Sequence, residues 1–163
     1  MDVGSFALGA ILVALCIAPF VAIHYHKRKL NSALLDVIKE EAASRHCQIS
    51  RFEFCGDFVL GLDDEKNTLF FHKDTKDETI TEFVDLHNIK SCKPEKKVRS
   101  INVNNQRSQI IERLDLVFIP KNGDDPIVRF ELYDESTGGQ LSGELQFLEE
   151  WAEKIQDRLA QLK

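Results

Sequence analysis

Several signatures of enzymes and metalloproteins are missing from this chain of 163 residues. It has no glycine-rich phosphate loop, no His-Glu-x-x-His pair and no nucleophile elbow. Its cysteines form no Cys-x-x-Cys pair, and we interpret all of them as small buried hydrophobic residues. We therefore expect no catalytic site, no cofactor and no bound metal. The cysteines are Cys16, Cys47, Cys55 and Cys92.

Positive charge is scarce over most of the chain. The first 29 residues hold one acid, Asp2, and three basic residues, Lys27, Arg28 and Lys29. Residues 30–163 therefore hold 18 Lys and Arg against 26 Asp and Glu, a formal charge of −8. Binding to nucleic acid relies on clusters of Lys and Arg that neutralise phosphates, so we expect no nucleic-acid partner.

Charged residues are also absent from residues 3–23, a run of 21 residues that is mostly apolar. As a helix this run would be about 31 Å long, close to the ~30 Å hydrocarbon thickness of a bilayer. Lys27, Arg28 and Lys29 follow it, and cytoplasmic flanks are the ones rich in Lys and Arg. The sequence therefore predicts a single-pass anchor over residues 1–29 in the plasma membrane (the inner membrane of a bacterium). The N-terminus would lie outside and the rest of the chain in the cytoplasm.

Two other interpretations of the apolar run remain open. A cleaved secretory signal normally begins with basic residues and ends in a small-residue cleavage site. This chain has an acid, Asp2, near its start and no Ala-x-Ala site. Leu15 precedes Cys16, where a lipoprotein signal requires a small residue. The third interpretation is a buried core helix, and we favour the uncleaved span.

A helical stripe follows the basic flank. Leu34, Leu35, Ile38 and Ala42 recur at helical spacing and predict an amphipathic helix over about 31–46, within a stalk of residues 30–47. This helix would either start anew near Asn31 or continue the span. Its apolar face would pack on the following domain or form a dimer contact, and we favour packing.

From residue 48 the apolar residues recur every second position, which is typical of strands. Turns are expected at Cys55-Gly56-Asp57 and at residues 63–67, and residues 120–126 are expected to connect a hairpin. The pattern predicts an antiparallel meander with strands near 52–54, 58–62, 68–72, 80–84, 89–92, 98–103, 113–119 and 127–133.

The end of the chain returns to helical spacing. Phe147 and Trp151 widen an apolar stripe whose opposite face is acidic. A helix of this kind commonly closes the open end of a sheet and so buries its apolar face. The stripe consists of Leu141, Leu145, Leu148, Ala152, Ile155, Leu159 and Leu162.

This order of strands and final helix resembles the pleckstrin-homology-like (PH-like) superfold in its bacterial versions. The matching stretches are FEFCGDFVLGLDDEKNTLFFHKD, ITEFVDLHNIKSC, RLDLVFI, IVRFELYD and the helix that carries Trp151. The resemblance covers residues 48–163. It implies an α+β domain, an antiparallel barrel or sandwich of about seven strands closed by the C-terminal helix. It does not extend to the family's phosphoinositide pocket, because the corresponding loop, Cys55-Gly56-Asp57, is short and acidic.

One basic stretch stands out in the acidic body. It is either a solvated strand edge that discourages edge pairing or a contact for an anion or an anionic lipid. We expect the domain to mediate protein interactions or scaffolding at the membrane, and the alternative is a lipid- or anion-sensing module that uses this stretch. Its members are Lys90, Lys93, Lys96, Lys97 and Arg99.

Overall fold

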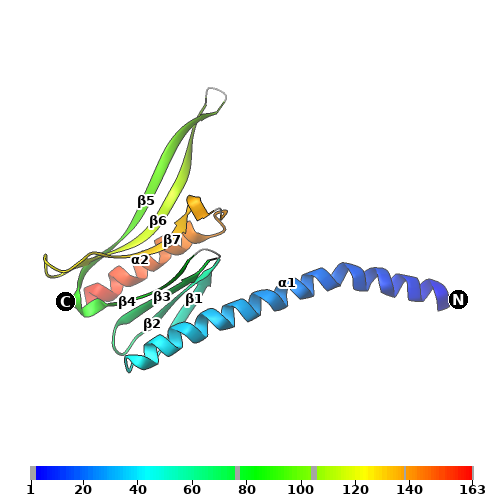
Figure 1. Cartoon of the computed structure of the whole chain (residues 1–163), viewed down its shortest axis with the longest axis horizontal. Helices are drawn as coiled ribbons and strands as arrows, with labels where there is room; N and C mark the ends of the chain where they lie inside the picture. Colours follow the sequence, from blue (N-terminus) through cyan, green and yellow to red (C-terminus); the bar gives the residue numbers. More distant parts are fainter. Residues whose placement is uncertain (1–2, 76–77, 104–105, 138, 163) are drawn as a thin grey trace.

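The computed structural model describes residues 3–75, 78–103, 106–137 and 139–162. Two antiparallel sheets face each other, one helix packs between their edges, and a long helix lies outside the first sheet and projects from the body (Figure 1). This confirms the predicted α+β class with seven strands and a C-terminal helix, but the described strands form two separate sheets, not a closed barrel. The elements are α1 (Val3–Ser44), β1 (Arg51–Cys55), β2 (Phe58–Asp63), β3 (Thr68–Asp74), β4 (Thr79–Asp85), η1 (Leu86–Asn88), β5 (Ile89–Val103), β6 (Gln106–Pro120), β7 (Val128–Asp134), η2 (Glu135–Thr137) and α2 (Glu144–Gln161).

The turns of the first sheet, which has the order β1-β2-β3-β4, lie where the sequence predicts them. Gly56 has φ +57 in the two-residue connection of β1 to β2, a conformation that glycine adopts without steric cost. In the next turn, the Asp63 carboxylate accepts hydrogen bonds from the backbone N–H groups of Glu65 and Lys66, both at 2.9 Å. The same side chain accepts from the Gln48 N–H at 2.7 Å, so this turn also fixes the segment that follows α1.

The second sheet, β5-β6-β7, differs from the prediction in two respects. Strand β6 begins at Gln106, seven residues before the strand expected at 113–119. The two strands expected at 89–92 and 98–103 form a single strand, β5, although it contains Pro94. The strand tolerates this proline because β5 lies at the edge of its sheet and pairs only with β6. The β5–β6 hairpin extends past the body as a two-stranded arm (Figure 1).

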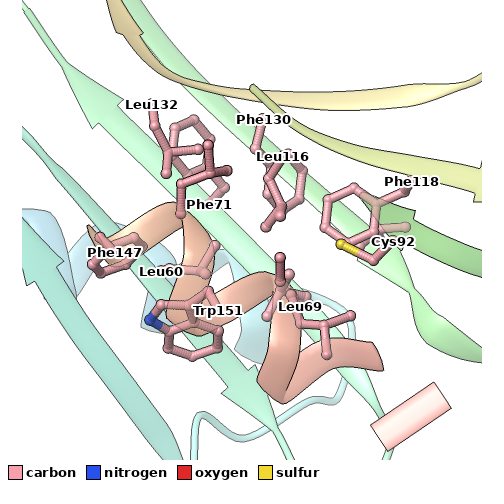
Figure 2. Close-up of a cluster of buried hydrophobic side chains, with 14 of the residues drawn as sticks. Leu60, Leu69, Phe71, Cys92, Leu116, Phe118, Phe130, Leu132, Phe147 and Trp151 are labelled. Carbon is pink, nitrogen blue, oxygen red and sulfur yellow. The ribbon is translucent and has the colours of Figure 1, made fainter. Parts of the chain in front are cut away.

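Aromatic side chains fill the core between the sheets and α2 (Figure 2). The ring centroids of Phe71 and Phe130 are 5.0 Å apart, and those of Phe118 and Phe130 are 4.8 Å apart. Phe147 and Trp151 close this cluster from α2. The two sheets and the C-terminal helix thus share one core, as a single domain requires.

The interpretation of the cysteines as buried residues is correct only for Cys92. Its side chain is buried in the core, and burial raises the pKa of its thiol to about 12. Cys47 and Cys55 are half-buried, and Cys16 is exposed on α1. Cys55 packs at the margin of the main core and Cys47 at the margin of the cluster beneath α1, so both are only partly buried.

Two residues of the predicted C-terminal helix, Leu141 of its apolar stripe and Glu144 of its acidic face, were placed wrongly. Leu141 precedes α2 and is exposed, because the helix begins only after Gly143, whose φ is 134°. Glu144, expected on the solvated face, is buried and accepts hydrogen bonds from the Ser142 N–H at 2.6 Å and the Ser142 hydroxyl at 3.1 Å. A carboxylate at this position occupies the first turn of the helix, where the backbone N–H groups favour negative charge.

The long helix α1 continues without a break across the predicted junction of anchor and stalk. Leu34, Ile38 and Ala42 are buried against Val59 and Phe70 on the outer face of the first sheet, so the predicted packing is confirmed. The predicted span, residues 3–23, lies mostly outside the residues whose side chains the structure describes. Over the described residues, no helix combines the length and apolar character needed to cross a bilayer.

The contact of α1 with the sheet is testable through Ile38, whose side chain is fully buried. Ile38→Ala is expected to lower the free energy of unfolding by about 2–4 kcal/mol, because it leaves a cavity beneath the helix. Val37→Ala, one position away on the exposed side, is the matched control and should change it by less than about 0.5 kcal/mol. Urea unfolding followed by the fluorescence of Trp151, the one tryptophan of the chain, measures both. Equal effects of the two substitutions would contradict the packing.

Candidate functional site

Two cavities lie between strand β1 and helix α2, one on each side of Glu53, whose carboxylate bridges to Trp151 at 2.8 Å and to Lys154 at 3.3 Å; we call the two cavities together the groove. β1 is the terminal strand of the first sheet, so only one of its edges is paired, to β2. The larger cavity, at the Arg51 end of β1, has a volume of about 590 Å³, and we call it the distal cavity. It is lined by Ser50, Arg51, Phe52, Glu53, Leu62, Leu86, Trp151, Lys154, Ile155, Asp157, Arg158 and Gln161.

The distal cavity has an apolar floor and a charged rim. Leu86, Trp151 and Ile155 are almost fully buried on the floor, whereas Phe52 on β1 is 45% exposed. The indole Nε1–H of Trp151 donates a 2.8 Å hydrogen bond to the Glu53 carboxylate, which fixes the ring against the strand. An apolar floor with a few oriented polar groups is typical of sites that take a bulky side chain.

A carboxylate, Asp64, holds the distal end of the groove together. It accepts a hydrogen bond from the Arg51 Nε–H at 2.7 Å and from the Ser50 hydroxyl at 2.8 Å. Arg158 of α2 lies 3.5 Å from the same carboxylate and donates at 2.6 Å to the Asn67 side-chain oxygen. The hydrogen bonds from Arg51, followed by that from Ser50, lower the pKa of Asp64 to about 2 despite an opposing effect of burial.

The opposite end of the groove has a different charge. A smaller cavity of about 180 Å³, the proximal cavity, lies beside Cys55 at the start of α2. Its charged lining residues are Glu53 and Glu150, both acids, whereas three cations and two acids line the distal cavity. Lys154 pairs with both proximal glutamates, at 3.3 Å and 3.9 Å, so the proximal end has one acid in excess and the distal end one cation in excess. The proximal lining consists of Glu53, Phe54, Cys55, Gly143, Gln146, Phe147 and Glu150.

The other sheet edges carry features that hinder the addition of a further strand. β5 contains Pro94, and Gln156 of α2 donates to its Cys92 carbonyl at 2.8 Å. On β4, Glu82 points inward, with one buried oxygen that has no partner among the described residues. Burial, followed by the nearby charge of Glu131, raises the pKa of Glu82. β7 pairs with β6 through an irregular register, whereas the pairing of β1 with β2 is regular.

The five basic residues singled out in the sequence do not converge on one site. Lys96 reaches α2 and lies 2.5 Å from the Glu149 carboxylate, whereas Lys97 lies 3.1 Å from Glu112 of β6. Arg99 pairs with the same glutamate at 3.5 Å and with Glu135 of η2 at 3.1 Å. Within the described part of the chain, Lys90 and Lys93 are exposed and make no ion pair.

The predicted membrane-flanking residues lie on α1 and line neither cavity of the groove. Arg28 and Lys29 are exposed, and the side chain of Lys27 lies outside the described residues. Among the His, Cys, Asp and Glu side chains that the structure describes, no cluster has the geometry to hold a metal ion.

Comparison with models of protein families, with curated proteins and with solved structures finds no match for this chain. The functional argument therefore depends on the groove. Sequence reasoning missed it, because Phe52 and Trp151 were interpreted only as strand and core residues. The local sequence carries no signal of it, because RFEF alternates charged and apolar residues as an ordinary half-buried strand does.

The charge network at the distal end predicts a pH dependence. Because the pKa of Asp64 is lowered, its stabilising effect is complete above the ordinary pKa of 3.8 and is lost as the pH falls toward about 2. Asp64→Asn should therefore lower the free energy of unfolding at pH 6 by about 1 kcal/mol, a value discounted for partial solvent exposure. The difference from the unsubstituted protein should shrink steadily between pH 4 and pH 2, as measured by urea unfolding.

Asp124→Asn is the matched control, since Asp124 lies in the exposed connection of β6 to β7. It should leave the free energy of unfolding unchanged to within about 0.5 kcal/mol at each pH. A loss for Asp64→Asn that is as large at pH 2 as at pH 6 would contradict the assigned network.

Proposed function

We propose that this chain is a single-pass membrane protein whose PH-like domain mediates protein interactions at the cytoplasmic face of the plasma membrane. The carrying observation is the groove between β1 and α2, which pairs an open strand edge with an apolar cavity. An extended segment of a partner would add to β1 through backbone hydrogen bonds and place one bulky side chain in the distal cavity.

Three features support the individual parts of this proposal. The apolar run at residues 3–23 and the basic flank after it support the anchor and its orientation. The succession of four strands, three strands and a closing helix supports the PH-like assignment. Anchoring supports the interaction role, because two proteins held in one membrane meet at a high effective concentration, which makes weak contacts sufficient.

The alternative, a sensor of anions or anionic lipids, has less support. Three of the five basic residues, Lys96, Lys97 and Arg99, are already paired with glutamates. Each of these pairs would have to open before the cation could bind a phosphate. The unpaired Lys90 and Lys93 are too few to resemble the clusters of 4–8 basic residues that recognise anionic lipid heads.

Photo-cross-linking in membranes of the source cells tests the interaction function. A photoreactive residue at Lys154, on the rim of the distal cavity, should give an adduct with another protein. Phe52→Asp should reduce that adduct at least tenfold, because aspartate on an edge strand hinders the pairing of a further strand and places a charge among the residues that line the distal cavity. Ile127→Asp is the matched control, because Ile127 is 54% exposed but lies in the β6–β7 connection, and it should leave the adduct unchanged. An adduct that both substitutions leave intact would exclude the groove as the interaction site.

Lysine labelling of the protein in vesicles tests the lipid alternative. The proposed anchor would attach the full-length protein to any vesicle, so binding alone does not separate the two functions. The measured quantity is therefore the labelling of Lys90 and Lys93 by a lysine-reactive reagent, compared between anionic and neutral vesicles. We expect equal labelling in both, because the body is acidic and its basic residues are mostly paired. Protection that appears only in anionic vesicles and disappears with Lys93→Glu would favour the lipid sensor.

A further inference from the structure

The distance of the groove from the end of the proposed membrane span, and the direction in which the groove runs, indicate what kind of partner it accepts. We infer that its occupant is the juxtamembrane segment of another membrane protein, extended along β1 with its basic end toward the bilayer. This inference rests on the proposed function, since it takes residues 3–23 as the span.

The unbroken helix α1 sets the height of the groove above the membrane. Ile38 lies against Gly61, where an added Cβ atom would be only 2.7 Å from its Cδ1 atom, and Gly61 pairs with Phe52 of β1. Fifteen residues separate Ile38 from Ile23, the last residue of the apolar run. At 1.5 Å per residue, Phe52 therefore lies about 22 Å beyond the end of the span.

The strand β1 also has a suitable direction. It runs back alongside the end of α1, toward the N-terminal end of that helix (Figure 1). Cys55, three residues after Phe52, therefore lies closer to the membrane by up to about 10 Å, the length of three strand residues, which places it no nearer than roughly 12 Å. An extended chain that emerges from the bilayer along its normal would reach this level after about four residues and would then run parallel to the groove.

Charge complementarity favours the same occupant. Cytoplasmic segments next to a span are rich in Lys and Arg. The end of the groove nearest the membrane is lined by Glu53 and Glu150, two acids that share a single cation, Lys154, at 3.3 Å and 3.9 Å, so one negative charge remains there for a basic residue of the occupant. The distal cavity, farther from the membrane, has three cations to two acids and an apolar floor. A matching segment therefore has basic residues next to its span and a bulky apolar residue about three positions beyond them, at the level of Phe52.

A second copy of this chain fits the groove poorly. Two copies that pair through the same strand edge do so antiparallel, about a two-fold axis perpendicular to the strands. Because β1 runs alongside α1, that axis would lie in the plane of the membrane (Figure 1). The two anchors would then point in opposite directions and could not share one bilayer.

The test uses the full-length protein in membranes of the source cells, with the photoreactive residue at Lys154 and the cross-linked peptide identified by mass spectrometry. The expected adduct lies about 7–10 residues from the end of a span in a different membrane protein, as 22 Å or more of extended chain requires. A second variant carries seven additional residues between Leu30 and Asn31. Seven residues are close to two helical turns, so they raise the groove by about 10 Å with little rotation.

In the variant with the insertion, the adduct should move about three residues farther from the partner's span or fall at least fivefold in yield. Near-identical urea unfolding of the two proteins would show that the domain still folds. Three results would overturn the inference and leave the proposed interaction function standing. They are an adduct whose position and yield do not respond to the insertion, an adduct between two copies of this chain, and an adduct with a protein that has no span. The absence of any adduct sensitive to Phe52→Asp would refute both.

Discussion

The packing of α1 on the first sheet is the constraint on which the rest of the structure depends. Ile38 and Ala42 fill the outer face over Val59 and Phe70, and a Cβ atom added at Gly61 would lie only 2.7 Å from the Ile38 Cδ1 atom, so a larger residue there would displace this side chain. Because the helix is continuous from Val3 to Ser44, the same contact that completes the outer side of the sheet also orients the domain relative to the N-terminal segment. A flexible linker at residues 24–33 would have left the height and direction of the groove undefined.

The helix α2 has a second role besides closing the core. Its apolar face covers the aromatic cluster between the sheets, while its charged residues are distributed between the two strand edges that it joins. Lys96 of β5 pairs with Glu149, and Gln156 occupies a carbonyl of the same strand, so that edge is partly occupied. On the β1 side, α2 makes its contacts through side chains: Trp151 with Glu53 and Arg158 with Asp64. The outer edge of β1, which pairs with no described strand, therefore remains beside the distal cavity.

The charges of the domain are organised by pairing more than by net charge. In a body of formal charge −8, the cations at the distal end of the groove remain because Asp64 serves both Arg51 and Arg158. On β5, by contrast, neighbouring basic residues pair with different acids. These residues are close in sequence, yet alternation along a strand sends neighbouring side chains to opposite faces, where separate glutamates pair with them. A cluster of lysines in a sequence is therefore a weak indication of a binding patch when it lies on a strand.

The sequence by itself determined most elements of this protein: a helical first segment, the strands of the first sheet with their turns, and a final amphipathic helix. These features follow from local causes, since periodicity, glycine at Gly56 and Asp63 in the next turn act over a few residues. Only the tertiary structure decided that residues 89–103 form one strand, that the sheets remain separate, and that Phe52, Trp151 and Arg158 border one groove. The physical reason is distance along the chain: about a hundred residues separate β1 from α2. Which strand edge remains open beside a helix depends on how whole elements pack, and no local pattern encodes it.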